Sequence, residues 1–369
     1  MDWHAPVELM TELARPVLIV AGGTGGHIYP ALAVADHLKN HNVSTIWLGS
    51  ERGLENRIVP EAGIQLYRIA VSGLRGRGLL RWLLAPFSLG FVLCQALYAI
   101  ARIRPGLVLG MGGFASGPGG LAAWICRRPL VIHEQNAIPG LTNSLLSRIS
   151  TKVLQGFPGA FPSGRDAITV GNPIRESIVS IATPGNRDFE SKAFKVLIVG
   201  GSLGAQTLNR CVPRAMERVR GSHLEIWHQT GVGHEVDTLR AYAQLTATVR
   251  VTEFIDDMAA AYSWASIVIC RAGAITVCEL AAAGVTSILV PFPYAVDDHQ
   301  TANASYLVKS NAALMIAEGP DFEVRLTEAI QELYDERREI MRYAERAREL
   351  AKPDAAARVA GHCMELLDV

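Results

Sequence analysis

One pattern occurs twice in this 369-residue chain and limits the folds open to it. Residues 17–26, VLIVAGGTGG, return at residues 196–205 as VLIVGGSLGA. Each copy has four branched apolar residues, then a glycine-rich turn, then a helical pattern. An unbroken apolar run of this kind is typical of a buried parallel strand, and parallel strands need helical crossovers. The repeat therefore predicts α/β architecture with two Rossmann-like, doubly wound parallel-sheet domains that face a cleft.

Further apolar runs predict the other strands, and the sequence between the two repeats indicates the domain boundary. Short apolar runs lead into polar or glycine-rich loops at residues 107–109, 130–132, 267–269 and 288–290. We expect an N-terminal domain over residues 15–171 and a C-terminal domain over residues 172–352. Residues 322–350 read as one charged, alanine-rich helical stretch. After Pro353 we expect a last helix within residues 353–369 that packs back toward the N-terminal domain.

Composition and charge narrow the class of protein. The chain is 49 % hydrophobic and 19 % charged, as globular proteins are, and its six cysteines form no CxxC pair. Residues 1–171 hold 15 Lys/Arg and 9 Asp/Glu, whereas the remainder holds 20 and 26. Residues 62–133 contain eight arginines and no acidic residue. Such a surface suits anionic lipids or a pyrophosphate, and without an aromatic-rich RNA-binding signature we expect no nucleic acid.

An uncharged stretch over residues 82–100 is long enough to cross a bilayer. It contains Pro86 and lies inside a well-patterned α/β domain, so we expect a helix that is buried or dips into a membrane rather than spans it. Basic and apolar residues alternate just before and within it, which predicts a membrane face that includes Arg75, Arg77, Arg81, Trp82 and Phe87. A structural role for these side chains is the alternative.

The two glycine loops suit phosphate groups. After a parallel strand, glycines let backbone N–H groups approach a ligand, and the next helix adds its positive end. Neither loop has the spacing of the dinucleotide fingerprint G-x-G-x-x-G, and neither has the lysine of a P-loop. For either loop alone, plain helix–sheet packing is an equal alternative. Two such loops from two domains predict a binding cleft.

Eight motifs occur in order along almost the whole chain. They are GGTGGH (22–27), GMGG with SGPG (110–119), HEQN (133–136), GNPIR (171–175), GGS (200–202), TEFIDDM (252–258), AGAITVCE (272–279) and DHQ (298–300). Together they resemble the MurG family, the UDP-GlcNAc transferases that convert lipid I to lipid II in peptidoglycan synthesis.

The resemblance implies a GT-B fold and an inverting glycosyltransferase with no cofactor. Its donor would be UDP-GlcNAc, and its acceptor lipid I, undecaprenyl-pyrophosphoryl-MurNAc-pentapeptide. It further implies a role in cell wall biogenesis, cell shape and cell division, peripherally at the cytoplasmic face of the bacterial inner membrane. Anionic membrane lipids and other cell-wall synthesis proteins are the further partners implied.

Family position also implies residue roles. Glu279 would accept hydrogen bonds from the ribose diol, although an acid favoured at a helix start is the alternative. His27 is the candidate general base, with pyrophosphate binding or a loop role as alternatives, and Glu134 is a second candidate base. Further donor- and substrate-binding positions are Thr24, Gly25, Gly26, Asn136, Arg175, Ser202, Ile255, Ala274, Ile275, Thr276, Val277, Cys278 and Gln300.

We expect no metal site, because the chain lacks a D-x-D signature and its acidic pairs at 256–257 and 297–298 diverge in extended loops. Helix ends would then stabilise the leaving UDP. Leu203 and Ala272 depart from the glutamine and serine usual in the family. Two other functions stay open: a UDP-GlcNAc 2-epimerase, which shares the layout, and a non-catalytic UDP-sugar-binding scaffold.

Overall fold

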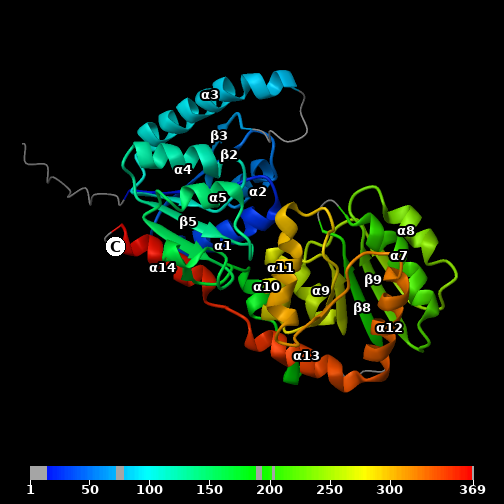
Figure 1. Cartoon of the computed structure of the whole chain (residues 1–369). Helices are drawn as coiled ribbons and strands as arrows, with labels where there is room; N and C mark the ends of the chain where they lie inside the picture. Colours follow the sequence, from blue (N-terminus) through cyan, green and yellow to red (C-terminus); the bar gives the residue numbers. More distant parts are fainter. Residues whose placement is uncertain (1–14, 72–78, 188–192, 202–203, 368–369) are drawn as a thin grey trace, which may run out of the picture.

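The computed structural model describes residues 15–71, 79–187, 193–201 and 204–367, and leaves out the side chains of residues 79–87 and 296. It has two α/β lobes, each built on one parallel sheet (Figure 1). The N-terminal sheet has the order β3 (Gln65–Ile69), β2 (Thr45–Ser50), β1 (Val17–Val20), β4 (Leu107–Gly110), β5 (Leu130–Glu134), β6 (Lys152–Gln155) and β7 (Ile168–Thr169). The C-terminal sheet has the order β10 (Thr248–Thr252), β9 (Leu224–Gln229), β8 (Phe194–Val199), β11 (Ile267–Cys270), β12 (Thr286–Leu289) and β13 (Leu314–Met315).

The two repeated segments form the central strands β1 and β8, which confirms the prediction of two doubly wound domains. In each sheet the strand order reverses beside that strand, between β1 and β4 and between β8 and β11. Doubly wound folds bind their ligands outside the carboxyl ends of the strands at such a switch point. The glycine loops that follow β1 and β8 lie at these two points.

Alternate residues of the central strands point into different helical layers. In the N-terminal domain Val17 and Ile19 contact the layer of α1 (Gly25–Asn40), whereas Leu18 and Val20 contact that of α3 (Leu79–Ile103). The remaining helices of this domain are α2 (Glu55–Glu61), α4 (Ser116–Ile125) and α5 (Leu141–Leu146). Each sheet is therefore buried on both faces, as its continuous apolar strands require.

The C-terminal domain repeats this arrangement. Leu197 packs toward α10 (Ala274–Ala283), and Val196 and Ile198 pack toward α7 (Gln206–Arg218). Its other helices are α6 (Glu176–Val179), α8 (Glu235–Ala241), α9 (Met258–Trp264), α11 (His299–Val308), α12 (Phe322–Asp335) and α13 (Arg337–Glu349). Short 3-10 turns occur at Ser163–Arg165, Pro184–Asn186 and Val296–Asp298.

The last helix, α14 (Ala355–Glu365), lies against α1 in the N-terminal domain (Figure 1). Its buried residues Val359, Ala360 and Cys363 belong to the same core as β1. The chain thus crosses from one domain to the other twice, after β7 and before α14, and both crossings lie close to the junction.

Residues 322–350 are helical as predicted, but they form two helices rather than one. The backbone leaves the helical region at Glu336, with φ −108° and ψ 67°. A straight helix of that length would extend about 40 Å along one direction. The break instead lets α12 pack on α7 while α13 turns to pack on α10.

Helix α3 contains the uncharged stretch. Four residues at helical spacing, Val92, Ala96, Ala99 and Ile100, are buried against the N-terminal sheet. Within the described part of the chain, no helix combines the length and apolarity needed to cross a membrane.

Each core also holds a buried neutral histidine. His228 on β9 pairs its two ring nitrogens with the Tyr242 hydroxyl at 2.9 Å and with Asn209 Oδ1 at 3.1 Å. Burial lowers the pKa of His228 to about 3. Burial likewise lowers the pKa of His133 on β5 to about 4, against the opposing effect of the Gly171 carbonyl.

These histidines should make stability fall in mild acid. Both stay neutral in the folded protein, whereas in the unfolded chain each binds a proton below a pH of about 6.5. The free energy of unfolding should therefore fall from pH 6.5 toward 4, by about 2 kcal/mol per histidine at pH 5. In His228→Gln, urea unfolding should lose about 2 kcal/mol less between pH 7 and pH 5. The exposed His41→Gln should behave as wild type, and an unchanged loss in His228→Gln would contradict the assignment.

Candidate active site at the domain junction

Loops that follow strands of both sheets meet at the domain junction. The side chain of Asn303 on α11 is fully buried there. Its Oδ1 accepts a hydrogen bond from the Ala137 N–H at 2.8 Å, and its Nδ2 donates to Asn136 Oδ1 at 3.3 Å. The same amide donates to the Ala272 carbonyl at 3.2 Å. One side chain thus joins the loop after β5 to the loop after β11, and brings predicted site residues of the two domains together.

Glu279 and Arg175 form an ion pair at the same junction. Arg175 Nη2 donates to Glu279 Oε1 at 3.1 Å, and the Tyr262 hydroxyl donates to Glu279 Oε2 at 3.1 Å. The guanidinium also lies 4.9 Å from the ring centroid of Tyr29, which belongs to α1 of the other domain. Burial raises the pKa of Glu279, and the positive charge of Arg175 acts against that shift. Arg175 is only partly buried, so one side of the pair can meet a ligand.

The N-terminus of α10 adjoins this pair and can bind an anion. Gly273 is its N-cap, and the first N–H groups of a helix have no partner within the helix. The Val277 N–H already donates to the Gly273 carbonyl at 2.9 Å, and the Val277 side chain is buried. The backbone donors available to a ligand are therefore those of residues 274–276, a narrower set than the predicted one.

Cys278 has a different use. Its Sγ accepts a hydrogen bond from Asn172 Nδ2 at 3.2 Å, and burial raises the pKa of its thiol to about 12. A thiol with so high a pKa is a poor nucleophile. Because Asn172 also donates to the Gln135 carbonyl at 2.9 Å, Cys278 belongs to the contacts that hold the two domains together.

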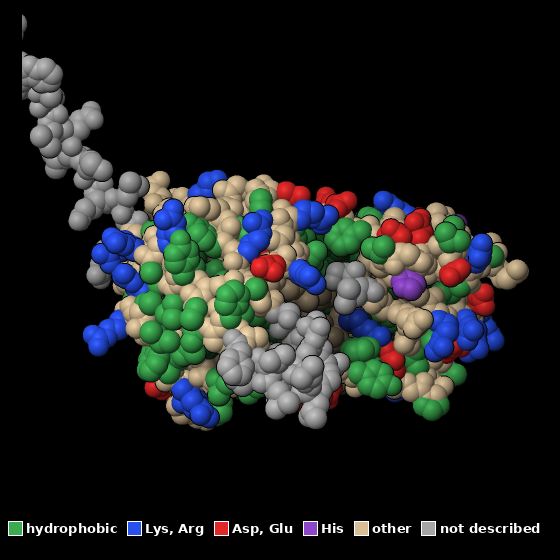
Figure 2. All heavy atoms as spheres, turned by 90° about the horizontal axis from the view of Figure 1, so that it is seen from above, with side chains coloured by type: hydrophobic (Ala, Val, Ile, Leu, Met, Phe, Trp, Pro, Cys, Tyr) green, Lys and Arg blue, Asp and Glu red, His purple; other side chains and the backbone are tan. Residues whose placement is uncertain are grey.

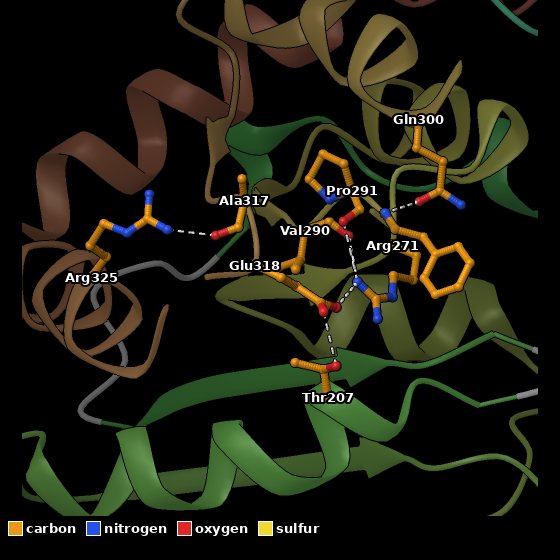
Figure 3. Close-up of polar contacts among 9 residues, drawn as sticks. Thr207, Arg271, Val290, Pro291, Gln300, Ala317, Glu318 and Arg325 are labelled. Atoms are coloured by element: carbon orange, nitrogen blue, oxygen red, sulfur yellow. Dashed lines mark hydrogen bonds and ion pairs between the residues drawn. The ribbon is translucent and has the colours of Figure 1, made fainter. Parts of the chain in front are cut away.

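Figure 3 shows a second group of polar contacts, around Arg271 in the loop after β11. Gln300, at the start of α11, accepts a hydrogen bond from the Phe292 N–H at 2.9 Å. Arg271, directly after β11, forms a 2.6 Å ion pair with Glu318, whose other oxygen accepts from the Thr207 hydroxyl at 3.1 Å (Figure 3). These contacts connect the loop after β11 to the start of α7, which follows the second glycine loop.

His27 lies in the first turn of α1, beside the loop after β4. A Cβ atom placed on Gly112 would lie 2.5 Å from Cδ2 of the His27 ring, so the ring packs directly on this glycine. Burial lowers the pKa of His27, while the nearby Gly22 carbonyl and the charge of Glu55 oppose the shift. The buried Nδ1 makes no well-aligned hydrogen bond. A neutral, partly buried imidazole can accept a proton.

Glu134 is almost fully buried at the end of β5 and its carboxylate is fully engaged. One oxygen accepts from the backbone N–H and the side-chain amide of Asn136, at 2.9 and 3.1 Å. The other accepts from the Gly140 N–H at 3.2 Å and from Asn143 Nδ2 at 2.9 Å. Burial raises the pKa of Glu134, and these donors oppose the rise. The carboxylate is thus well placed to hold the 136–140 loop, and His27 is the better candidate base.

The remaining predicted positions differ in how exposed they are, and some lie outside the described residues. Thr24, Gly25 and Gly26 begin α1 and are wholly or partly exposed, whereas the Ile255 side chain is buried in the C-terminal core and leaves only its backbone for a ligand. Ser202 and Leu203 lie outside the described residues, as do Arg75 and Arg77; the side chains of Arg81, Trp82 and Phe87 are also outside the description.

Two of the acidic residues considered for metal binding serve locally. Asp257 caps α9, with its Oδ1 2.9 Å from the Ala260 N–H, and Asp298 accepts from the Thr301 hydroxyl at 2.7 Å. No group of three potential metal ligands occurs among the residues that the structure describes.

Known proteins resemble this chain over most of its length. The profile of the glycosyltransferase family 28 N-terminal domain matches residues 17–155, and that of the family 28 C-terminal domain matches residues 195–359. The UDP-N-acetylglucosamine–N-acetylmuramyl-(pentapeptide) pyrophosphoryl-undecaprenol N-acetylglucosamine transferase of Nitrosococcus oceani is 49 % identical over 96 % of this chain and 99 % of its own. The transferase of the same name from Methylococcus capsulatus is 50 % identical, with equal coverage.

Solved structures resemble this chain as well. The crystal structure of MurG from Acinetobacter baumannii has a TM-score of 0.81 and 38 % identity, and covers 95 % of this chain and 99 % of that one. A UDP-N-acetylglucosamine 2-epimerase from Listeria monocytogenes has a TM-score of 0.66 at 12 % identity, which shows a shared fold alone.

The contact between Gly112 and His27 can be tested by stability. Gly112 has φ +95°, which disfavours any side chain, and a Cβ there would collide with the ring. We expect Gly112→Ala to lower the free energy of urea unfolding by about 2–4 kcal/mol. Gly159→Ala is the matched control, because Gly159 also has a positive φ, +76°, but no atom near its Cβ position, and should lower it by only the backbone cost of about 1–2 kcal/mol. Equal effects of the two changes would mean that the His27 ring does not rest on Gly112.

Proposed function

The chain belongs to glycosyltransferase family 28, and we propose that its two domains bind the two substrates of a MurG reaction on either side of the junction described above. Like its relatives, the chain is a UDP-GlcNAc-dependent N-acetylglucosaminyltransferase that transfers GlcNAc to lipid I in peptidoglycan synthesis. The epimerase alternative is not favoured, because the solved epimerases share only the fold with this chain.

The C-terminal domain would bind UDP-GlcNAc. The observation that carries this assignment is the Arg175–Glu279 pair beside the N-terminus of α10. The free N–H groups of residues 274–276 and the Arg175 guanidinium supply positive charge for a diphosphate. Glu279 supplies acceptor oxygens for the ribose diol, and Gln300 an amide for the sugar hydroxyls. Ile255, with its side chain in the core, would meet uracil through its backbone.

The N-terminal domain would present the acceptor. In the transfer, the acceptor oxygen forms a bond to C1 of GlcNAc while the bond from C1 to the diphosphate oxygen breaks, which inverts the configuration. The departing electron pair stays on UDP, whose charge the N-terminus of α10 stabilises. The acceptor proton passes to His27, whose ring is kept neutral by burial and so can accept it.

Replacing His27 tests its role as the base. His27→Ala should lower kcat with UDP-GlcNAc and a lipid I analogue by about 10²–10⁴-fold, because proton transfer then has no acceptor. Steady-state kinetics on purified protein is the measurement, with His37→Ala, at the other end of α1, as the matched control that should keep kcat. A loss below tenfold would reduce His27 to a binding or structural role.

We further propose that the protein lies peripherally on the cytoplasmic face of the bacterial inner membrane, through its N-terminal domain. Its relatives' names place their acceptor on an undecaprenol chain. Figure 2 shows hydrophobic side chains gathered over the N-terminal domain with Lys and Arg around them. Among the side chains that the structure describes, the large exposed apolar ones on α3, α4, α5 and their loops are Leu89, Phe91, Tyr98, Phe114, Leu121, Trp124, Ile125, Leu141 and Leu145. Such a patch with exposed cations at Arg127 and Arg148 suits an anionic bilayer surface.

A triple change tests this surface. Phe91→Ser, Trp124→Ser and Leu145→Ser together should reduce co-sedimentation with phosphatidylglycerol vesicles, because the apolar side chains no longer enter the headgroup boundary. Turnover should fall for a long-chain lipid acceptor and stay near wild type for a short soluble analogue. The control, Val236→Ser with Leu239→Ser, removes equally exposed apolar residues from α8 of the other domain. Vesicle binding that only the control reduces would place the membrane contact on the C-terminal domain.

A further inference from the structure

Glu55 is a buried charged residue that the mechanism above does not use. It is the first residue of α2, and none of its surface is exposed. Its Oε2 accepts a hydrogen bond from the Gly23 N–H at 3.0 Å. Its Oε1 accepts from both the N–H and the hydroxyl of Ser50, at 2.8 and 2.6 Å. The carboxylate therefore connects the first glycine loop, after β1, to the last residue of β2.

The chain leaves room for this carboxylate at three glycines. A Cβ atom on Gly22, Gly49 or Gly53 would come within 3 Å of the Glu55 side chain. Gly22 and Gly49 have no positive φ, so their backbone conformations do not themselves require glycine. Their lack of a side chain is explained by the volume that Glu55 occupies.

Burying a carboxylate in this space costs more free energy than burying an apolar side chain there. Among the described residues, Glu55 forms no ion pair, and burying an unpaired charge costs free energy unless hydrogen bonds compensate. All of its partners here are donors, and only a carboxylate offers two acceptor oxygens with no donor of its own. The site is therefore built for a carboxylate, which an apolar or amide side chain could not replace.

Its position connects it to His27. Gly23, which Glu55 holds, precedes Thr24, the N-cap of α1. The Thr24 carbonyl in turn accepts a hydrogen bond from the His27 N–H at 3.1 Å. Fixing Gly23 thus fixes the start of the helix that carries the imidazole. The negative charge of Glu55 also acts on His27 in the direction that favours its protonated form.

We propose that Glu55 is a positioning residue for the transfer reaction, which holds the first glycine loop and the His27 ring in place and stabilises the imidazolium that forms. The inference rests on the proposed role of His27 as proton acceptor. It assigns Glu55 no contact with either substrate.

Glu55→Gln tests the proposal, because it keeps the size of the side chain. Whichever way its amide turns, the new NH₂ group faces a backbone N–H, that of Gly23 or that of Ser50. We expect kcat with a lipid I analogue to fall at least tenfold, with the Kd for UDP-GlcNAc within twofold of wild type. Hydrogen exchange of the peptide covering residues 20–27 should quicken. Kinetic constants are referred to the number of UDP-binding molecules, so that loss of folded protein does not count as loss of kcat.

Asn56→Ala is the matched control. Asn56 is the next residue of α2, and its amide donates to the Ser50 and Gly53 carbonyls at 2.9 and 3.1 Å without touching Glu55. It should lower the melting temperature and leave kcat near wild type. If Glu55→Gln does not fold, Glu55→Asp replaces it: the charge stays, but the shorter side chain cannot reach both Gly23 and Ser50, and kcat should again fall at least tenfold.

The outcomes separate this inference from the proposed function. If Glu55→Gln, or a folded Glu55→Asp, keeps kcat as Asn56→Ala does while His27→Ala is impaired, the role of Glu55 is overturned and that of His27 stands. If His27→Ala itself keeps kcat, the proposed base is wrong, and with it the imidazolium that Glu55 would stabilise.

Discussion

The carboxylate of Glu279 is buried in the domain junction and cannot remain there without a partner. Arg175 provides the opposite charge from the segment that links the two sheets, and Tyr262 provides a hydroxyl from α9. Tyr29 of the N-terminal domain lies against the same guanidinium. Removing one member of such a pair leaves the other charge uncompensated in a poorly solvated place. The pair therefore couples the C-terminal side of the junction to the position of the N-terminal domain.

Much of the fold could be predicted, because its strongest elements are local. The central strands β1 and β8 are buried on both faces, and their continuous apolar runs indicate parallel strands directly. The edge strands β7 and β13 have two residues each, too few to make a pattern. The break at Glu336 was also missed, since both helices share one composition and only their different packing partners separate them. His133 and Glu134 extend β5 although they are polar, because their partners lie elsewhere in the chain.

The site residues that belong to sequence motifs could be predicted. Single residues whose hydrogen-bond partners lie far along the chain could not. The glycine loops and the start of α10 follow strands, which is a readable position. Asn303 and Glu55 are single polar side chains on helices, and each has a partner far along the chain, 166 and 32 residues away. The sequence alone does not distinguish such a buried side chain from a solvent-exposed one, because its partner is known only from the fold. The three glycines around Glu55 are visible in the sequence, but the sequence does not show that the Glu55 side chain fills the space beside them.

Isothermal titration calorimetry of UDP-GlcNAc with wild type, Glu279→Ala and Glu345→Ala tests whether the donor binds in the C-terminal domain beside the Arg175–Glu279 pair. Glu279→Ala should weaken the Kd by about 10–100-fold, as expected when hydrogen bonds to a charged group are lost. The exposed Glu345 on α13 lies outside the site, and its replacement should leave the Kd unchanged. An unaltered Kd in Glu279→Ala, with the protein folded, would mean that the donor binds elsewhere.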